Sequence, residues 1–252
     1  MKEAVMRTSK KALKHEVHDL SRRMFFSKAT LAKHLPAASV GELHFLRNML
    51  HAEQESRTSS RRARYVKNAG FPVMKSFESY DFSGIQFPRL LSKEQMLSLD
   101  FIQEKKVLLF YGGCGSGKTH ALTALGIMAC NADFKVKFFT VSQLVLLMKK
   151  AHHEGTLEKF MSSMERLDLL CLDEFGYLPL DLESGQLLFQ VIASAYERQA
   201  IIMTTNLPFN AWGPLFADEQ LAAAIIDRIV HYGHMIKTGD KDWRLSHSLM
   251  ID

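Results

Sequence analysis

Short apolar runs alternate with segments of helical periodicity over the second half of the chain. Five runs predict strands that are buried on both faces, at residues 106–111, 135–140, 167–172, 200–205 and 234–238. Four segments predict amphipathic or buried helices, near residues 118–130, 142–153, 185–198 and 219–232. Strands that alternate with helices in this way predict an α/β protein with a parallel, doubly wound sheet.

The first 104 residues follow a different pattern. Residues 1–70 read as helices, and Leu43, Leu46 and Leu50 lie on one helical stripe. Residues 71–104 carry several aromatic side chains, which indicate a docked connector rather than a loose linker: Phe71, Phe77, Tyr80, Phe82 and Phe87. We therefore expect a basic helical N-terminal domain at 1–70, an aromatic-rich connector at 71–104 and an α/β core at 105–252.

The most specific chemistry follows the first predicted strand of the core. The run from Gly112 to Thr119 fits G-x-x-x-x-G-K-[ST], in which glycines let several backbone N–H groups point at one phosphate. Lys118 would reach the β- and γ-phosphates of ATP, and the Thr119 hydroxyl would bind Mg²⁺. The strand, loop and helix context favours a phosphate site over a turn that binds nothing. The expected nucleotide-binding residues are Gly112, Gly113, Cys114, Gly115, Ser116, Gly117, Lys118 and Thr119.

Polar side chains end two further predicted strands. Asp173 and Glu174 follow the run 167–172, at the carboxyl edge where open α/β sheets bind ligands. Asp173 would hold Mg²⁺, and Glu174 would polarise the water that attacks the γ-phosphate. Asn206 follows the run 200–205 and could hold that water, but it could equally cap the turn before Leu207-Pro208. The residue types alone leave this choice open.

Composition narrows the class of protein. The chain has 252 residues, of which 47% are hydrophobic, and this is enough for a packed core. No apolar run approaches the roughly 18 residues that a membrane span needs, and the N-terminus does not look like a secretory signal. Cys114, Cys130 and Cys171 are too widely spaced for a zinc site or a disulfide framework. We therefore expect a cytoplasmic protein without a membrane partner.

Positive charge is concentrated in the N-terminal part of the chain. Residues 1–80 contain 16 Lys and Arg against 7 Asp and Glu, whereas the remainder contains 16 against 20. This distribution favours nucleic acid as a partner over a merely solvated helix face. The candidate DNA-binding residues of this part are Arg61, Arg62, Arg64 and Lys67.

Three further basic residues have more than one interpretation. Lys149 and Lys150 end the predicted helix 142–153, where cations either contact a phosphate backbone or simply stabilise the helix C-terminus. Arg228 lies near the end of the predicted helix 219–232. It could be a plain surface residue, or it could reach the γ-phosphate of a neighbouring subunit as an arginine finger.

Taken together, these segments resemble the AAA+ ATPases of the IstB/DnaC branch, and most closely the IstB-type transposition helper ATPases of bacterial insertion sequences. The resemblance covers about residues 57–245. It is carried by the phosphate loop with His120, by Trp243-Arg244-Leu245, and by the segments 61–72, 168–179, 204–209 and 222–228.

The resemblance implies an ATPase that uses ATP and Mg²⁺, forms a homo-oligomer with ATP at its subunit interfaces, and binds double-stranded DNA. It would assist a separate transposase encoded by the same element. The resemblance adds His120 to the nucleotide site, makes Asn206 a sensor and Arg228 a finger that acts in trans, and associates Lys149 and Lys150 with DNA. A DnaC-type replicative helicase loader is the alternative. A second alternative is a scaffold that binds ATP without hydrolysing it, and the presence of Glu174 argues against this alternative.

The chain departs from the family pattern at two places. Gly113-Cys114-Gly115-Ser116 stands where relatives more often have Pro-x-Gly-Thr, although the defining Gly117, Lys118 and Thr119 remain. Only 24 residues follow Arg228, which predicts that the C-terminal helical lid of larger AAA+ proteins is absent. Arg244 would then be the candidate to replace the sensor residue of such a lid.

Overall fold

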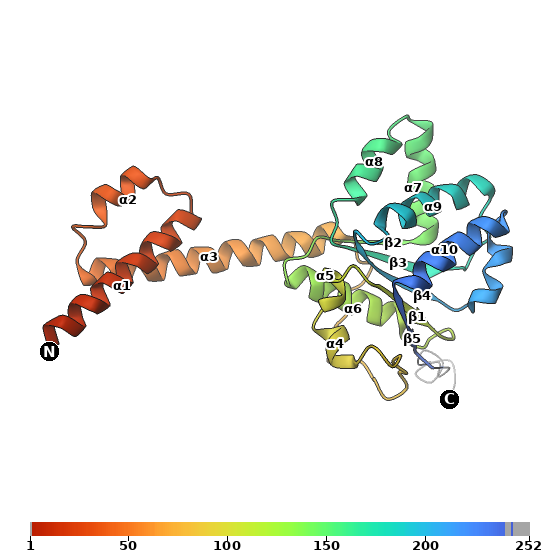
Figure 1. The fold of residues 1–252 in the computed structure, drawn as a ribbon, viewed down its shortest axis with the longest axis horizontal. Coiled ribbons are helices and arrows are strands. Elements are labelled where there is room, and N and C mark those ends of the chain that lie inside the picture. Colours follow the sequence, from red (N-terminus) through yellow and green to blue (C-terminus); the bar gives the residue numbers. More distant parts are fainter. Residues whose placement is uncertain (1, 240–242, 244–252) are drawn as a thin grey trace. The chain divides into compact units, whose positions relative to one another are not determined.

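The computed structural model describes residues 2–239 and residue 243 (Figure 1). The chain forms two compact units, Met1–Arg62 and Ala63–Asp252. The division falls within helix α3 (Val40–Ala69). The last turns of α3 belong to the second unit because Tyr65, Val66 and Ala69 pack into its hydrophobic core.

The N-terminal unit is a small helical domain made of α1 (Lys2–Arg23), α2 (Lys28–His34) and the first part of α3. Its core forms where an apolar stripe of α1 packs against an apolar stripe of α3. Each stripe consists of residues three, four or seven positions apart, which lie on one side of a helix. The residues of this core are Leu13, Val17 and Leu20 from α1 and Leu43 and Leu50 from α3, with Leu46 packed against them.

The second unit is built on a five-stranded sheet with the order β2-β3-β4-β1-β5. All strand pairs are parallel, which confirms the predicted α/β fold class. The strands are β1 (Val107–Tyr111), β2 (Val136–Thr140), β3 (Leu169–Phe175), β4 (Ala200–Thr205) and β5 (Gly233–Lys237). The strand β3 continues three residues beyond the predicted end at 172, so that Asp173 and Glu174 lie within the strand rather than after it.

Helices cover both faces of this sheet (Figure 1). One face packs against α7 (Val141–His153), α9 (Leu182–Ala195) and α10 (Glu219–His231), and the other packs against α6 (Lys118–Asn131), α4 (Lys93–Leu97) and α5 (Asp100–Gln103). Two short 3₁₀ turns, Phe209–Ala211 and Gly213–Leu215, precede α10. The helix α9 begins at Leu182, earlier than predicted, because Asp181 accepts a hydrogen bond from the N–H of Ser184 and caps the first turn.

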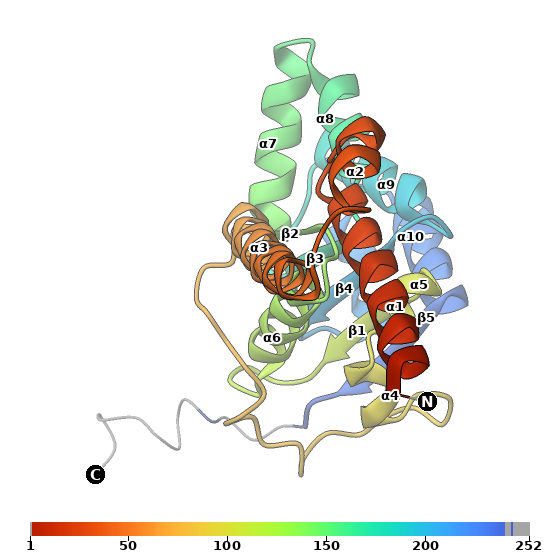
Figure 2. The ribbon, with the colours of Figure 1, turned by 90° about the vertical axis from the view of Figure 1, so that its left-hand side faces the viewer.

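The helices α7 and α8 (Leu157–Met164) form a pair that projects from the second unit (Figure 2). Thr140 caps α7 by accepting the N–H of Gln143, and the Gln143 side chain returns a hydrogen bond to the N–H of Thr140. None of the helices in the described part of the chain is long and apolar enough to cross a membrane.

The connector between α3 and β1 is anchored to α6 by aromatic side chains. A Cβ atom at Gly126 would lie 2.7 Å from the ring of Phe71, so the helix needs glycine here to accept that ring. Phe71 also meets Phe138 of β2 edge-on, with 5.9 Å between the ring centroids. Further along the connector, Tyr80 packs against His120 of α6, 5.0 Å between centroids. The connector therefore lies directly against the helix that leaves the phosphate loop.

Candidate nucleotide-binding site

The glycine-rich loop joins β1 to α6, and its glycines are sterically required. Gly115 and Gly117 have φ values of 70° and 87°, in the left-handed region that favours glycine. A Cβ atom at Gly112 would lie 2.3 Å from the Thr238 hydroxyl, so no side chain fits there. The loop therefore brings its backbone close to the N-terminus of α6, where N–H groups and the helix dipole attract an anion.

Lys118 is buried at the start of α6 and its side chain folds back over the loop. Its ammonium donates hydrogen bonds to the carbonyl oxygens of Gly112 at 2.9 Å and Gly113 at 2.6 Å. A phosphate entering the loop would offer this ammonium a charged acceptor in place of neutral carbonyls, which makes a stronger hydrogen bond.

Asp173 receives hydrogen bonds from two different elements. Its carboxylate is 4% exposed, and one oxygen accepts the hydroxyl of Thr119 at 3.0 Å. The hydroxyl of Thr204, on the neighbouring strand β4, donates to the same oxygen. The loop, β3 and β4 therefore converge on one buried carboxylate.

An irregularity in the pairing of β3 with β4 separates the two acids. Leu172 pairs with Met203 and Phe175 pairs with Thr205, so the Asp-Glu pair faces the single residue Thr204. Two residues opposite one define a β-bulge, which changes the direction of a side chain. The sheet thus keeps the first acid buried and turns the second one outward.

Glu174 is the exposed member of this pair. Its φ is 61°, a conformation that costs a residue with a side chain about 1–2 kcal/mol. Its backbone N–H donates to the Thr204 hydroxyl at 3.0 Å, which fixes the bulge. Strain of this kind is typical of functional sites, where the surrounding structure maintains it.

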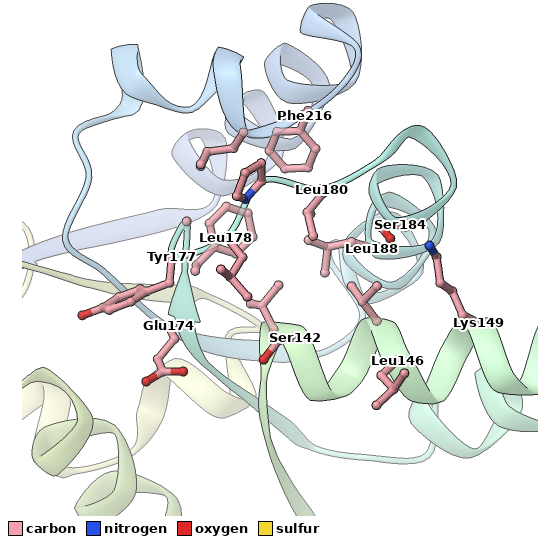
Figure 3. Close-up of a pocket in the computed structure, with 16 residues that line it drawn as sticks. Ser142, Leu146, Lys149, Glu174, Tyr177, Leu178, Leu180, Ser184, Leu188 and Phe216 are labelled. Atoms are coloured by element: carbon pink, nitrogen blue, oxygen red, sulfur yellow. The ribbon is translucent and has the colours of Figure 1, made fainter.

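A pocket of about 260 Å³ opens beside Glu174 (Figure 3). Glu174 and Tyr177 lie at one end of it and Lys149 at the other. The pKa of Tyr177 is raised, mainly by partial burial and also by the neighbouring Cys114 of the phosphate loop. The segment after β3 therefore contacts the phosphate loop directly.

Asn206 follows β4 at the same edge of the sheet. Its side-chain oxygen is buried and has no hydrogen-bond partner among the described residues. A buried oxygen without a partner is costly, and it indicates a site that a bound water or ligand completes. This favours the sensor interpretation over the turn-capping one, since the turn is capped instead by Thr205, whose hydroxyl accepts the N–H of Leu207 at 3.1 Å.

These residues fit a magnesium ion bound together with nucleotide phosphates. Mg²⁺ takes oxygen ligands in protein and usually keeps several waters, and the oxygens of Thr119 and Asp173 approach to 3.0 Å. The described part of the chain holds no cluster of three or more His, Cys, Asp or Glu side chains that could bind a metal. The hydroxyl, one carboxylate, phosphate and water would therefore make up the coordination shell.

A second cavity of about 390 Å³ lies against the loop itself. Its size is that of a small-molecule site, and its lining combines the loop with the connector and the C-terminal segment: Tyr80, Asp81, Ile85, Gly115, Ser116, Gly117, His120, Thr238 and Trp243 are among its residues. Burial raises the pKa of Tyr80 to about 12. This position suits the base and sugar of a nucleotide whose phosphates occupy the loop.

Sequence reasoning missed part of this cavity. The aromatic content of the connector signalled that it docks, but not that Tyr80 lies beside the loop. His120, which we expected at the nucleotide site, lines the cavity and donates from Nε2 to the Ser76 carbonyl oxygen at 2.7 Å. Trp243 donates its backbone N–H to the Gly115 carbonyl oxygen at 3.2 Å. Arg244, the candidate sensor, lies outside the described residues, and the expected absence of a C-terminal lid stays a prediction.

The structure does not bring Arg228 to the phosphate loop of its own chain. Its guanidinium donates to the Ala224 carbonyl oxygen of the same helix at 2.8 Å. It also lies over the rings of Phe189, 4.8 Å from the centroid, and Tyr196, 6.0 Å from the centroid. These contacts hold Arg228 half-buried between α9 and α10.

The expected DNA-binding residues differ in their surroundings. Lys149 is bound to Asp181 at 2.6 Å and Glu183 at 3.6 Å, whereas Lys150 pairs with Glu154 at 3.8 Å and keeps 70% of its side chain exposed. On α3, Arg61 is half-buried, whereas Arg62, Arg64 and Lys67 are exposed. A DNA phosphate at Lys149 would therefore have to compete with two carboxylates.

A phosphate loop between β1 and α6, an Asp-Glu pair on β3, which β4 separates from β1, and a parallel five-stranded sheet define a P-loop nucleotide-binding protein with an AAA+ type core. The chain belongs to the family described as IstB-like ATP binding protein, whose family model matches residues 18–250. This confirms the resemblance that the sequence motifs indicated, and with it an ATP-binding protein.

Several relatives carry the names of ATP-binding proteins of insertion sequences. One, of insertion sequence IS5376 in Geobacillus stearothermophilus, is 31% identical over 238 residues, which are 92% of this chain and 95% of the relative. Another, of IS21 in Pseudomonas aeruginosa, is 34% identical over 183 residues, or 71% of this chain and 68% of the relative.

Solved structures with a similar fold include replication proteins. The DnaC helicase loader has a TM-score of 0.49 and 21% identity, over 71% of this chain and 99% of the loader. The replication initiator DnaA bound to AMPPCP and single-stranded DNA has a TM-score of 0.48 and 19% identity, over 58% of this chain and 47% of that chain.

Proposed function

We propose that this chain hydrolyses ATP and uses the nucleotide cycle to assemble on double-stranded DNA, where it assists the transposase of the same insertion sequence. The observation that carries the proposal is the hydrogen bonding of Thr204, which places a buried and an exposed acid, Asp173 and Glu174, beside the phosphate loop. The names of the relatives, which belong to insertion sequences, support the role in transposition.

Each residue of the site has a distinct part in hydrolysis. The loop N–H groups and the Lys118 ammonium bind and orient the phosphates, while Thr119 and Asp173 hold Mg²⁺. The ion, when bound, neutralises charge that develops on the phosphate oxygens. Glu174 accepts a proton from the attacking water, and the free oxygen of Asn206 orients that water.

Arg228 is proposed to act on the nucleotide of a neighbouring subunit. In the described residues its contacts are aromatic rings and one carbonyl oxygen, and none is an ion pair with a carboxylate. Its positive charge is therefore not neutralised by a carboxylate within the described part of the chain and can offset the charge of the transferred phosphoryl group. A site completed by a neighbour would make hydrolysis depend on assembly and would place ATP at the subunit interface.

DNA binding is proposed for two basic regions. On α3 it involves Arg61, Arg62, Arg64 and Lys67, and at the end of α7 it involves Lys149 and Lys150. Because Lys149 is bound to Asp181 and Glu183, a DNA phosphate would have to replace these carboxylates as its partner. Lys150 pairs with a single, more distant carboxylate, that of Glu154 at 3.8 Å, and most of its side chain is exposed.

Sedimentation of the Glu174→Gln variant with ATP tests this function, on duplex and single-stranded DNA of equal length. The substitution keeps the shape of the side chain and removes the base, so ATP should bind and persist. We expect large ATP-dependent assemblies on duplex DNA, and none with Lys118→Ala as the control that cannot bind the phosphates.

Two results would contradict the proposal. Small complexes that prefer single strands would indicate a DnaC-type helicase loader instead. A wild-type protein that binds ATP but does not hydrolyse it, with or without DNA, would indicate a nucleotide-dependent scaffold.

A further inference from the structure

The turn that follows α1 exposes two phenylalanines on the N-terminal unit. Phe25 is 88% exposed and Phe26 is 38% exposed. Among the large hydrophobic side chains of the described residues, Phe25 is the most exposed. A single exposed hydrophobic residue is ordinary, so the backbone and the charge around Phe25 decide whether it has a role.

The backbone of Phe25 adopts a conformation that normally selects glycine. Its φ is 68°, in the left-handed region. The N–H of Phe25 donates to the Arg22 carbonyl oxygen and the N–H of Phe26 donates to the Ser21 carbonyl oxygen, both at 3.1 Å. This is the Schellman pattern at the end of a helix, in which the left-handed residue is usually glycine. A large aromatic residue here is unfavourable for the backbone and gains nothing from burial, a conflict that is expected at functional positions.

Basic residues flank the two phenylalanines in the sequence. The sequence from Leu20 to Gly41 contains no Asp or Glu, whereas it contains Arg22, Arg23, Lys28 and Lys33. The guanidinium of Arg22 donates to the Phe26 carbonyl oxygen at 3.0 Å, which places a cation against the backbone of the turn. Arg23 and Lys28 are exposed on either side of the turn.

An exposed aromatic ring bordered by cations matches the chemistry of nucleic acid. Bases offer flat apolar faces on which an aromatic ring can stack, and phosphates lie within reach of neighbouring cations. A partner protein would have to be acidic around an apolar pocket to fit the same surface. The charge and the strained, outward position of Phe25 together favour the nucleic acid.

We propose that the Phe25–Phe26 turn is a DNA-stacking wedge, in which Phe25 inserts at a base step while Arg22, Arg23 and Lys28 contact phosphates. This site rests on the proposed binding of double-stranded DNA, but it lies outside the ATPase core and uses residues that the nucleotide site does not. Inserting a ring between base pairs unstacks them and kinks the duplex.

A duplex containing 2-aminopurine tests the wedge, because the fluorescence of this base rises when it is unstacked. The full-length protein with a non-hydrolysable ATP analogue should increase the fluorescence. Phe25→Gly should abolish the increase and weaken duplex affinity by about 5- to 100-fold. Since glycine suits the left-handed position, this variant should unfold at the same temperature as the wild type or higher. Phe45→Ala, at a position 71% exposed on α3, is the matched control and should change neither signal.

The cations can be tested in the same assay. Replacing both Arg23 and Lys28 with Ala should weaken binding and reduce the slope of log affinity against log salt by about 1.8. If the wild type binds duplex DNA and Phe25→Gly shows the same affinity and the same fluorescence increase, the wedge is wrong. The proposed binding of duplex DNA is then unaffected. A Phe25→Gly protein that keeps its DNA affinity but no longer binds the transposase would also overturn it, in favour of protein docking. Failure of the wild type to bind any duplex would instead contradict the proposed function.

Discussion

The hydroxyl of Thr204 on β4 donates a hydrogen bond to the carboxylate of Asp173 on β3. The same hydroxyl oxygen accepts the backbone N–H of Glu174 at 3.0 Å. One side chain on the neighbouring strand thus fixes the positions of both acids of the site. This relationship explains how a strand can keep one carboxylate buried and expose the next one.

Thr204→Val should therefore impair both stability and hydrolysis. The substitution keeps the shape but leaves a buried carboxylate oxygen with one donor fewer and the N–H of Glu174 without its acceptor. Such a loss costs about 1–3 kcal/mol of unfolding free energy, measured by urea denaturation. The turnover of ATP should fall about 10- to 100-fold because the acids are displaced.

The control is Thr205→Val, because the Thr205 side chain bonds to Leu207 and to neither acid. This variant should hydrolyse ATP at the normal rate. Normal turnover in Thr204→Val would remove its positioning role.

Mixing two inactive variants tests whether Arg228 acts across a subunit interface. Arg228→Ala should bind ATP but not hydrolyse it, and Glu174→Gln should behave in the same way. In a mixed assembly, an intact Arg228 on one subunit can serve an intact site on its neighbour, so part of the activity should return. A mixture as inactive as its components would contradict action in trans.

The ring of Phe189 lies 4.8 Å from the Arg228 guanidinium. Phe189→Leu removes this ring, so it should lower the turnover of ATP while ATP binding remains.

The ion pair of Lys149 predicts a dependence of stability on pH. The hydrogen bond from Lys149, followed by those from Ser184, holds the pKa of Asp181 well below its ordinary value of 3.8. A carboxylate with a lowered pKa stabilises the fold above its unfolded pKa, and the contribution is lost as the pH falls through the folded value. Asp181→Asn should therefore show a smaller loss of stability below about pH 4 in chemical denaturation.

The neighbouring lysine provides the control for this prediction. Lys149→Ala should raise the pKa of Asp181 in an NMR titration, whereas Lys150→Ala should not, because Lys150 pairs with Glu154. A pKa of Asp181 that is the same in both variants would show that the ion pair does not persist in solution.

The three cysteines should differ sharply in reactivity. Cys114 is exposed in the phosphate loop, whereas burial raises the pKa of Cys130 to about 12 and that of Cys171 well above its ordinary value. Since the thiolate is the reactive form, a maleimide should label one thiol of the folded protein. Mass spectrometry should locate it at Cys114, ATP should slow the reaction, and the labelled protein should lose ATP binding.

The Cys114→Ser variant should resist labelling and still bind ATP. It serves as the control, because serine keeps the small polar side chain of the loop. Labelling of a buried cysteine in the folded protein, or a rate that ATP leaves unchanged, would contradict this account of the loop.

Local sequence information was sufficient for much of this protein. Apolar periodicity predicted all five strands and the helices α6, α7, α9 and α10, though not the short α8, because burial on a sheet face and on a helix stripe repeats at fixed intervals. The phosphate loop was predictable for a similar reason. Its glycines, Lys118 and Thr119 are contiguous, and the backbone geometry they require is set within eight residues.

The sequence by itself thus determined most of the elements, the class of fold and the position of the phosphate-loop motif. Only the tertiary structure decided which distant residues meet. The bulge that exposes Glu174 depends on the register between β3 and β4, and the ion pair of Lys149 joins residues 32 positions apart. The ring of Tyr80 reaches the loop because the connector crosses α6. Such contacts follow from how elements pack on one another, and neither residue of a pair carries a local signal for its partner.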